Sequence, residues 1–141
     1  MAIAASPANP DKVYALIETD SYKDERGLYV SNNAGKNWTK VSSEPQLVQR
    51  AWYYTHIFAD PVDVDTVYGL NVGAMKSTDG GKTFQNAGFV THGDHHDLWI
   101  NPLNNKALIG GNDGGATVTV NGTNWTPQNN QPTSELYRLT V

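Results

Sequence analysis

The sequence predicts an all-β fold built from repeated four-stranded antiparallel sheets. The 141 residues include 14 Asn, 13 Thr and 13 Gly, and only 17% are charged. Asn and Gly favour turns and β-branched Thr favours strands, so this composition argues against a helical bundle. A similar segment also recurs three times along the chain, and each copy closes on an aromatic residue. The length is sufficient for a buried core between such sheets.

The spacing of the repeat indicates the architecture. The closing aromatics are Trp38, Phe84 and Trp125, which lie 46 and 41 residues apart. Spacings of about 40–50 residues are typical of the blades of a β-propeller, each of which has four antiparallel strands. Because a closed propeller has roughly 4–8 blades, we expect an incomplete propeller. The predicted units are blades at 1–42, 43–88 and 89–128, with 129–141 as the first strand of a following blade.

Four strands are expected in each unit, with the fourth starting at the closing aromatic. An Asn-Pro or Asp-Pro turn follows the first strand, where the missing N–H of proline ends the hydrogen-bond ladder. The closing aromatics are expected to pack between the sheets. The expected first strands are 56–59 and 97–100, the second strands 13–17, 66–70 and 106–109, and the third strands 28–31, 74–77 and 117–120.

The turn before each closing aromatic carries the most specific motif. Ser77–Phe84 fits the pattern Ser-x-Asp-x-Gly-x-Thr-aromatic, and Ser31–Trp38 fits it with Asn at the acidic and Thr positions. We expect the Asp79 carboxylate to accept backbone N–H groups across the turn and Gly81 to adopt a positive φ. This motif resembles the Asp-box, or BNR repeat, of sialidases, sortilin-type ectodomains and xyloglucan-active propeller glycosidases. A structural role for Asp79 is therefore favoured over a catalytic one.

The third unit extends this resemblance. Asp94–Pro102, followed by Gly111–Gly115, is similar to large bacterial BNR-repeat proteins described as sortilin-like or glycosyl hydrolase-like. The resemblance implies a secreted or periplasmic propeller that acts on or binds carbohydrate, glycoside hydrolase-like if it is an enzyme. The alternative is a non-enzymatic, sortilin-like propeller that binds a peptide or protein, or a scaffold. The chain itself begins without the features of a signal peptide.

Propeller geometry predicts where a ligand would bind. The loop between successive units and the loop between the second and third strands open at the same face, the usual ligand site. Asp94, Asp97 and Asp113 are the candidate catalytic acids. The aromatic run can stack on sugar rings, although at least one of its rings should pack between blades. The candidate binding residues are Trp52, Tyr53, Tyr54, His92, His95, His96 and Asn112.

The segment around His95 leaves several roles open. It can bind substrate, hold a metal through imidazole and carboxylate groups, or serve only the fold. Neighbouring side chains on a strand point to opposite faces, so His95 and His96 should not both serve one site. We expect at least one of them to lie within hydrogen-bond reach of Asp113 and to face the mouth of the propeller. Asp113 can instead cap the Gly114–Gly115 turn.

Several function classes are disfavoured. The net charge is −4 and no basic run is present, which argues against nucleic-acid binding. No apolar run approaches the ~20 residues of a membrane helix, and the absence of Cys excludes disulfides. The three Arg residues lack the flanking motif of a sialidase triad. We assign no cofactor and no metal. The uncovered blade faces predict self-association or contact with the remaining blades of a larger chain.

Overall fold

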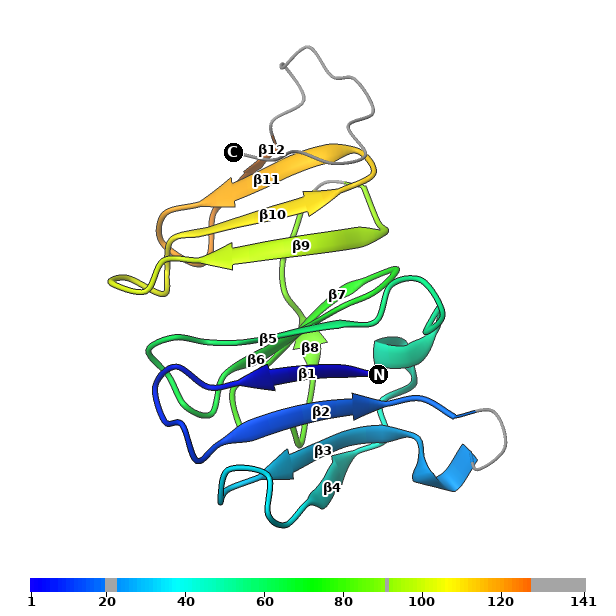
Figure 1. The fold of residues 1–141 in the computed structure, drawn as a ribbon. Helices are drawn as coiled ribbons and strands as arrows, with labels where there is room; N and C mark the ends of the chain where they lie inside the picture. Colours follow the sequence, from blue (N-terminus) through cyan, green and yellow to red (C-terminus); the bar gives the residue numbers. More distant parts are fainter. Residues whose placement is uncertain (20–22, 91, 128–141) are drawn as a thin grey trace, which may run out of the picture.

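The fold consists of three four-stranded antiparallel sheets, here called blades 1, 2 and 3 in chain order (Figure 1). The computed structural model describes residues 1–19, 23–90 and 92–127. Two short 3₁₀ helices, η1 (Lys23–Glu25) and η2 (Pro45–Val48), lie in the connections. The strands are β1 (Ala2–Ala5), β2 (Val13–Ile17), β3 (Gly27–Ser31) and β4 (Thr39–Ser42) in blade 1, β5 (His56–Ala59), β6 (Val67–Leu70), β7 (Ala74–Ser77) and β8 (Gln85–Asn86) in blade 2, and β9 (His95–Ile100), β10 (Leu108–Asn112), β11 (Gly115–Thr119) and β12 (Trp125–Pro127) in blade 3.

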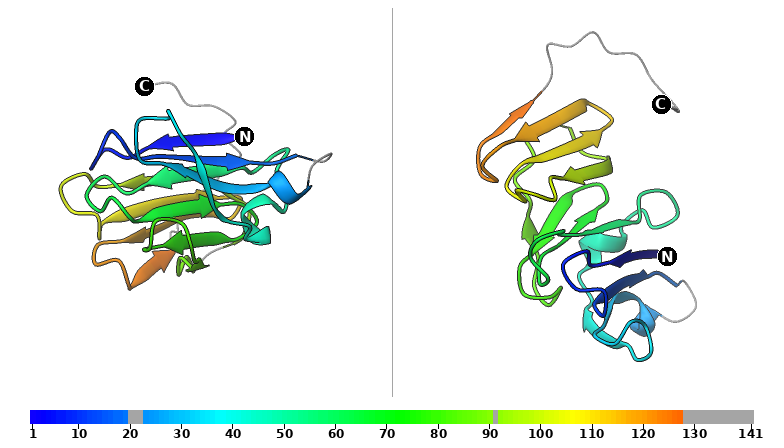
Figure 2. Two further views of the ribbon diagram at one scale, coloured as in Figure 1. Left: turned by 90° about the horizontal axis from the view of Figure 1, so that it is seen from below. Right: turned by 60° about the vertical axis from the view of Figure 1, so that its left-hand side comes forward.

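The three sheets are arranged around their first strands. β1 contacts β5 and β5 contacts β9, and each sheet extends away from this line in strand order (Figures 1 and 2). This arrangement confirms the predicted all-β, incomplete propeller. The predicted strand within 129–141 lies outside the described residues. No helix among the described residues combines the length and the apolar character needed to span a bilayer.

Two apolar cores lie between the blades. The first joins blade 1 to blade 2 and contains Tyr14 and Leu28 from one side and Ile57 and Val67 from the other, with Leu47 of η2 packed against them. The second joins blade 2 to blade 3. Its buried residues are Tyr68, Leu70, Ala74, Leu98 and Leu108. Neighbouring residues of β6 go to different cores, Val67 to the first and Tyr68 to the second, so both faces of blade 2 are buried.

The closing aromatics of blades 2 and 3 pack as predicted, whereas that of blade 1 does not. Phe84 packs against the first core and Trp125 against the second. Trp38, which was predicted to be a core residue, is 40% exposed. The reason is geometric, since each of these rings packs against the preceding blade and the described residues contain no blade before Trp38. Its Nε1–H instead donates to the Gly35 carbonyl over 3.0 Å.

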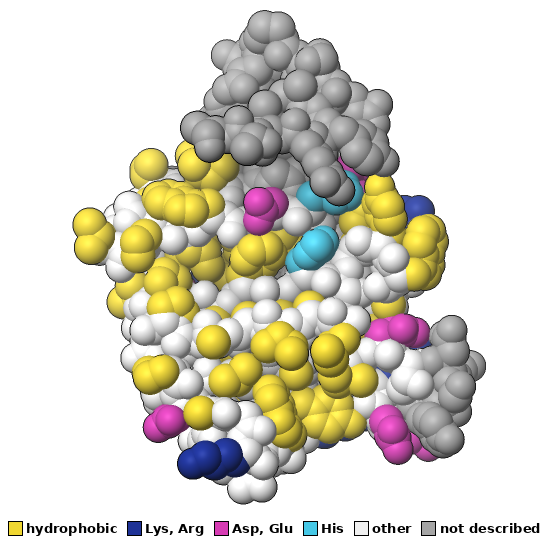
Figure 3. All heavy atoms as spheres, in the orientation of Figure 1, with side chains coloured by type: hydrophobic (Ala, Val, Ile, Leu, Met, Phe, Trp, Pro, Cys, Tyr) yellow, Lys and Arg dark blue, Asp and Glu magenta, His cyan; other side chains and the backbone are white. Residues whose placement is uncertain are grey.

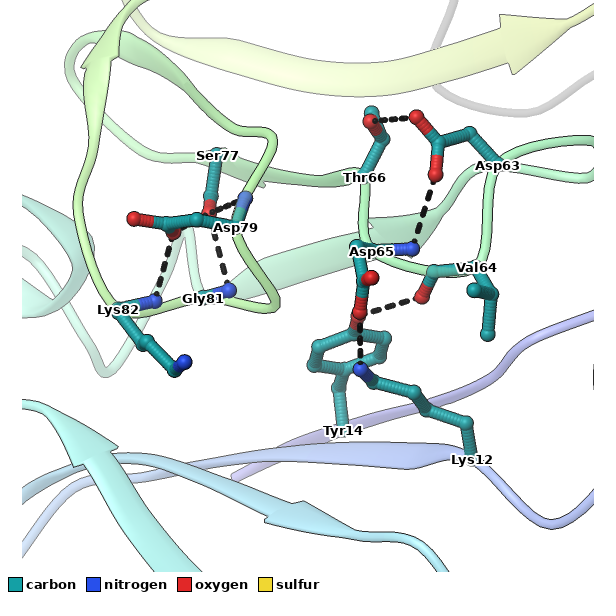
Figure 4. Close-up of polar contacts among 10 residues, drawn as sticks. All are labelled: Lys12, Tyr14, Asp63, Val64, Asp65, Thr66, Ser77, Asp79, Gly81 and Lys82. Carbon is teal, nitrogen blue, oxygen red and sulfur yellow. Dashed lines mark hydrogen bonds and ion pairs between the residues drawn. The ribbon is translucent and has the colours of Figure 1, made fainter.

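The Ser77–Phe84 turn is held by its own side chains (Figure 4). Asp79 Oδ1 accepts the N–H groups of Lys82 and Thr83 at 3.0 and 2.9 Å, which confirms the predicted cap. Ser77 Oγ accepts the Gly81 N–H at 2.9 Å. Gly81 has a φ of 86°, as predicted, and a Cβ there would lie 2.5 Å from a methyl carbon of Leu28 on blade 1.

Polar contacts near these turns also join blades 1 and 2 (Figure 4). Lys12 Nζ lies 2.5 Å from Asp65 Oδ1, and the Tyr14 hydroxyl donates to the Val64 carbonyl over 2.9 Å. Within blade 2, the Gly80 N–H donates to the Asp65 carbonyl over 2.8 Å. The turn between the first two strands and the turn between the last two therefore lie at the same end of a blade. We call this the turn end.

Candidate functional site

The remaining loops meet at the opposite end, as the sequence predicted. Those of blades 2 and 3 and of the connections between blades include residues 43–55, 71–73, 87–90, 92–94 and 112–115, and we call this the mouth end. The Asp113 N–H donates to the Asp94 carbonyl over 3.3 Å, and the Asp94 N–H donates to the Val72 carbonyl over 3.0 Å. Loops from blades 2 and 3 are thus tied together by backbone hydrogen bonds.

Asn71 fixes the loop that carries the aromatic run. This side chain is buried, and its Oδ1 accepts the Arg50 N–H at 3.2 Å. Its Nδ2 donates to the carbonyls of Leu47 and Tyr54 at 3.2 and 3.3 Å. A buried amide that satisfies several backbone groups holds a loop in one conformation. Asn71 was not among the predicted site residues, because no motif in the sequence indicates this role.

His96 and Asp113 form a short polar contact at the mouth end. His96 Nε2 lies 2.6 Å from Asp113 Oδ1, and both side chains are about half exposed. This confirms the expected contact between one of the two adjacent histidines and Asp113. The alternative role of Asp113 as a turn cap is wrong. Asn112 takes that role, because its Oδ1 accepts the Gly114 N–H at 2.9 Å.

His95 points away from this pair, as strand alternation predicted. It is buried, and its ring packs edge-on against Phe89 with the ring centres 5.1 Å apart. Burial lowers the pKa of His95, which favours the uncharged imidazole. His95 therefore belongs to the packing between blades 2 and 3, and its ligand-binding role stays a prediction.

Arg50 joins the aromatic run to blade 3. Its Nη1 lies 3.4 Å from Asp94 Oδ1, and its guanidinium lies over the rings of Tyr54 and Trp52, 5.0 and 5.7 Å from their centres. Asp94 adopts a positive φ of 57°, a conformation that Asp tolerates better than most residues. Arg50 was not among the predicted site residues.

The aromatic run divides into one buried ring and two exposed rings. Tyr54 is buried, as expected for at least one of the three, and its ring centre lies 4.9 Å from that of His96. Burial, reinforced by Asp94 and Asp113 and opposed by Arg50, raises the pKa of the Tyr54 phenol. Trp52 is 79% exposed and Tyr53 is 52% exposed, with their ring centres 5.8 Å apart. Arg50, Tyr54, His96 and the two carboxylates thus form one connected cluster beside two solvent-facing rings.

The other predicted residues lie around this cluster. His92 is exposed, and its carbonyl accepts the Asn112 Nδ2–H at 2.8 Å. Asp97 Oδ1 accepts the Leu98 N–H at 2.8 Å, within its own strand. His56 was not predicted as a site residue, yet its pKa is lowered by burial and by nearby His96. His56 could have been predicted, because it occupies the same position in β5 as the predicted site residue Asp97 occupies in β9.

A separate apolar depression lies along the inner strands. Its volume is about 270 Å³, and it is lined by residues of β1, β5 and β9 such as Ala4, Phe58 and Trp99. The lining contains aliphatic and aromatic residues in place of the predicted site residues. Among the described residues, no three His, Asp or Glu side chains are grouped closely enough to hold a metal ion.

Comparisons with known proteins agree with the fold. The GH74 enzyme of Niastella koreensis matches with a TM-score of 0.66 and 18% identity over 89% of this chain, and the GH74 xyloglucanase of Xanthomonas campestris matches with 0.60 and 15% over 93%. YCF48 bound to D1 peptide matches with 0.56 and 14% over 91%. The chain spans 22% and 23% of the two GH74 enzymes and 39% of YCF48. The likeness shows a β-propeller fold. Searches of protein-family models and of curated proteins found no match.

Proposed function

We propose that this chain is part of an Asp-box, or BNR-repeat, β-propeller of the glycoside-hydrolase-like kind that binds carbohydrate at its mouth end. The turn motif supports the Asp-box assignment, because Ser77 and Asp79 make the hydrogen bonds that the motif requires. The GH74 neighbours support the glycoside-hydrolase-like assignment at the level of fold. One of them is described as a xyloglucanase.

The observation that carries the proposal is the pair of exposed rings, Trp52 and Tyr53, beside a polar cluster. Sugar rings present C–H groups that pack on aromatic faces, and their hydroxyls need donors and acceptors at the edges of that platform. Arg50 with Asp94, and His96 with Asp113, supply both kinds of group next to the rings. An aromatic platform with charged hydrogen-bonding groups suits an uncharged, hydroxyl-rich ligand.

The same proposal can be extended from binding a carbohydrate to hydrolysing it. Glycosidases use two carboxyl groups on either side of the scissile bond. Asp94 and Asp113 are the better candidates for such a pair, because both belong to the connected cluster of Arg50, Tyr54 and His96, whereas Asp97 is bonded to its own strand. Each of the two already has a side-chain partner, Arg50 for Asp94 and His96 for Asp113. The arrangement therefore favours ligand binding over catalysis by this chain.

The test measures binding of xyloglucan oligosaccharides and cello-oligosaccharides by calorimetry. We expect Trp52→Ala and Tyr53→Ala each to weaken binding at least tenfold. The control Leu103→Ala removes an exposed apolar side chain at the turn end and should leave affinity unchanged. For hydrolysis, Asp94→Asn and Asp113→Asn are compared with Asp79→Asn in an assay of released reducing ends. Equal binding by the native chain and Trp52→Ala would refute the carbohydrate site, and binding without hydrolysis would refute the catalytic roles.

A peptide ligand is the second candidate. It is favoured by the likeness to YCF48, one structure of which is described as bound to D1 peptide, and by the sortilin-like sequence motif. A peptide would use the same exposed rings together with Arg50 or Asp94 at a charged position. A peptide array screened with the native chain and with Trp52→Ala separates this ligand class from carbohydrate.

We also propose an extracellular or periplasmic location, supported by the resemblance to secreted Asp-box proteins. Fractionation of the source cells, followed by detection with an antibody against this chain, tests it. Recovery only with cytoplasmic markers would refute it.

A further inference from the structure

Trp52 and Tyr53, here called the mouth-end rings, lie on a loop that the neighbouring blades hold in place. Residues 43–55 connect blade 1 to blade 2, and Leu47 of this loop is buried in the core between them. Asn71 of blade 2 makes three hydrogen bonds to the backbone of the same loop. Figure 3 shows hydrophobic, His and basic side chains gathered at the right of this view, at the level of blades 2 and 3. The mouth-end rings are therefore exposed at blade 2, which has a blade on each side.

The two rings do not share a plane. The centres of the Trp52 and Tyr53 rings are 5.8 Å apart, and their planes are inclined by 51°. Tyr53 contacts two further rings nearly edge-on, Tyr54 with centres 4.6 Å apart at 89° and His96 with centres 6.1 Å apart at 83°. These contacts hold Tyr53 in its inclined position. A flat ligand that stacks on Trp52 therefore meets Tyr53 at an angle, and no single plane covers both rings.

One face of Trp52 is already covered by the protein. The Arg50 guanidinium lies over this ring, 5.7 Å from its centre, which is within the range of a cation–π contact. Arg50 is held there by Tyr54, whose ring centre is 5.0 Å away, and by Asp94 at 3.4 Å. Trp52 is nevertheless 79% exposed, so its other face opens to solvent. The site thus offers one open indole face beside an inclined phenol ring.

We propose that the mouth-end rings bind a single sugar residue, at the end of a chain or on a branch, in place of a run of linked residues. This inference rests on the carbohydrate-binding function proposed above. A linear glucan is a flat ribbon, so its successive residues need aromatic faces that follow one plane. Here one residue stacks on the open face of Trp52, and the inclined ring of Tyr53 stands against its edge. The hydroxyls of that residue meet the charged pairs of Arg50 and His96, and the rest of the chain leads away from the rings.

The length of the oligosaccharide is the variable that tests this proposal. Calorimetry compares cellobiose with cellohexaose, and a xyloglucan oligosaccharide of one repeat with one of two repeats. We expect the affinity per mole of oligosaccharide to stay within threefold in each series, because added residues make no further stacking contact. A larger gain with length would overturn the proposal and leave the carbohydrate site in place. Absence of binding to every oligosaccharide would refute the carbohydrate site and this proposal together.

Saturation-transfer NMR locates the contact on the ligand. When aromatic protons of the native chain are irradiated in the presence of cellotriose, we expect saturation at least threefold stronger on one sugar residue than on the other two. Trp52→Phe keeps a ring face and should retain this pattern, whereas Trp52→Ala should abolish it. The control Trp38→Ala removes an exposed ring at the turn end and should leave the pattern unchanged. Equal saturation of adjacent sugar residues by the native chain would overturn the proposal.

Discussion

Asp79 offers the sharpest test of how the turns stabilise the blades. Its Oδ1 accepts the Ser77 hydroxyl at 2.7 Å and the N–H groups of Lys82 and Thr83, and its Oδ2 accepts the Thr83 hydroxyl at 2.6 Å. Asp79→Ala removes all four bonds, whereas Asp79→Asn retains an oxygen for the three bonds made by Oδ1. Comparing the two variants therefore separates the stability contributed by the three bonds to Oδ1 from that contributed by Oδ2 and the negative charge.

The expected magnitudes follow from these bonds. Loss of a side-chain cap typically costs 0.5–2 kcal/mol, and here two backbone N–H groups lose their acceptor at once. We expect Asp79→Ala to lower the free energy of unfolding by about 2 kcal/mol. Asp79→Asn should cost about 0.5–1 kcal/mol, because an amide already serves in the matching turn of blade 1. There, Asn33 Oδ1 accepts the Asn37 N–H at 2.9 Å.

Urea denaturation, monitored by circular dichroism, measures the loss in free energy of unfolding for both variants. The dependence of that loss on pH is an independent check. Hydrogen bonds from the hydroxyl and N–H of Thr83, and then from the Ser77 hydroxyl, lower the pKa of Asp79. A lowered carboxyl pKa stabilises the fold at pH values above the ordinary carboxyl range, and this contribution is lost as pH falls through the folded-state pKa. The advantage of the native chain over Asp79→Asn should therefore shrink in acid. Equal losses for Ala and Asn at neutral pH would refute this reasoning.

Three further substitutions test the packing between loops and blades by urea denaturation. Asn71→Ala should cost about 3 kcal/mol, because it leaves several buried backbone groups without partners, and a loss below 1 kcal/mol would contradict that role. Tyr14→Phe should cost about 1 kcal/mol through the lost hydrogen bond to Val64, and no measurable loss would show that water replaces it. Burial lowers the pKa of His95 and His56, so stability should fall as pH drops below about 6.5. His95→Phe should flatten this slope between pH 7.5 and 5.5, and an unchanged slope would assign it to other groups.

The fold could be predicted because its signals are local. Each blade carries its own proline turn, glycine turn and closing aromatic, so three copies of one pattern fixed the strand order. Strand ends were less accurate, since β9 starts at His95, two residues before the prediction. Pairing of His95 with Asn112 across an irregular register extends that strand. Trp38 was misplaced because its burial depends on a neighbouring blade, which a local pattern does not reveal.

The candidate site was predictable only where strand topology decides it. Adjacent strands bring the start of β9 next to the turn after β10, which is why the contact between His96 and Asp113 could be anticipated. The pairing of Arg50 with Asp94 depends on the path of residues 43–55. That path is set by hydrogen bonds from buried Asn71 to backbone groups far along the chain. No spacing rule in the sequence encodes such contacts.

The two ends of the blades differ in a way that bears on function. At the turn end, Asp79 and its counterparts bond mainly within their own turns, and the same pattern recurs in each blade. At the mouth end, Arg50 reaches Asp94 and Tyr54 reaches His96, so the contacts cross from blade 2 to blade 3, and they have no repeat among the described residues. A feature that serves only the fold should recur wherever the fold recurs. In the part of the chain that the structure describes, the exposed rings and charged pairs of the mouth end occur once, which supports a role for them in recognising a ligand.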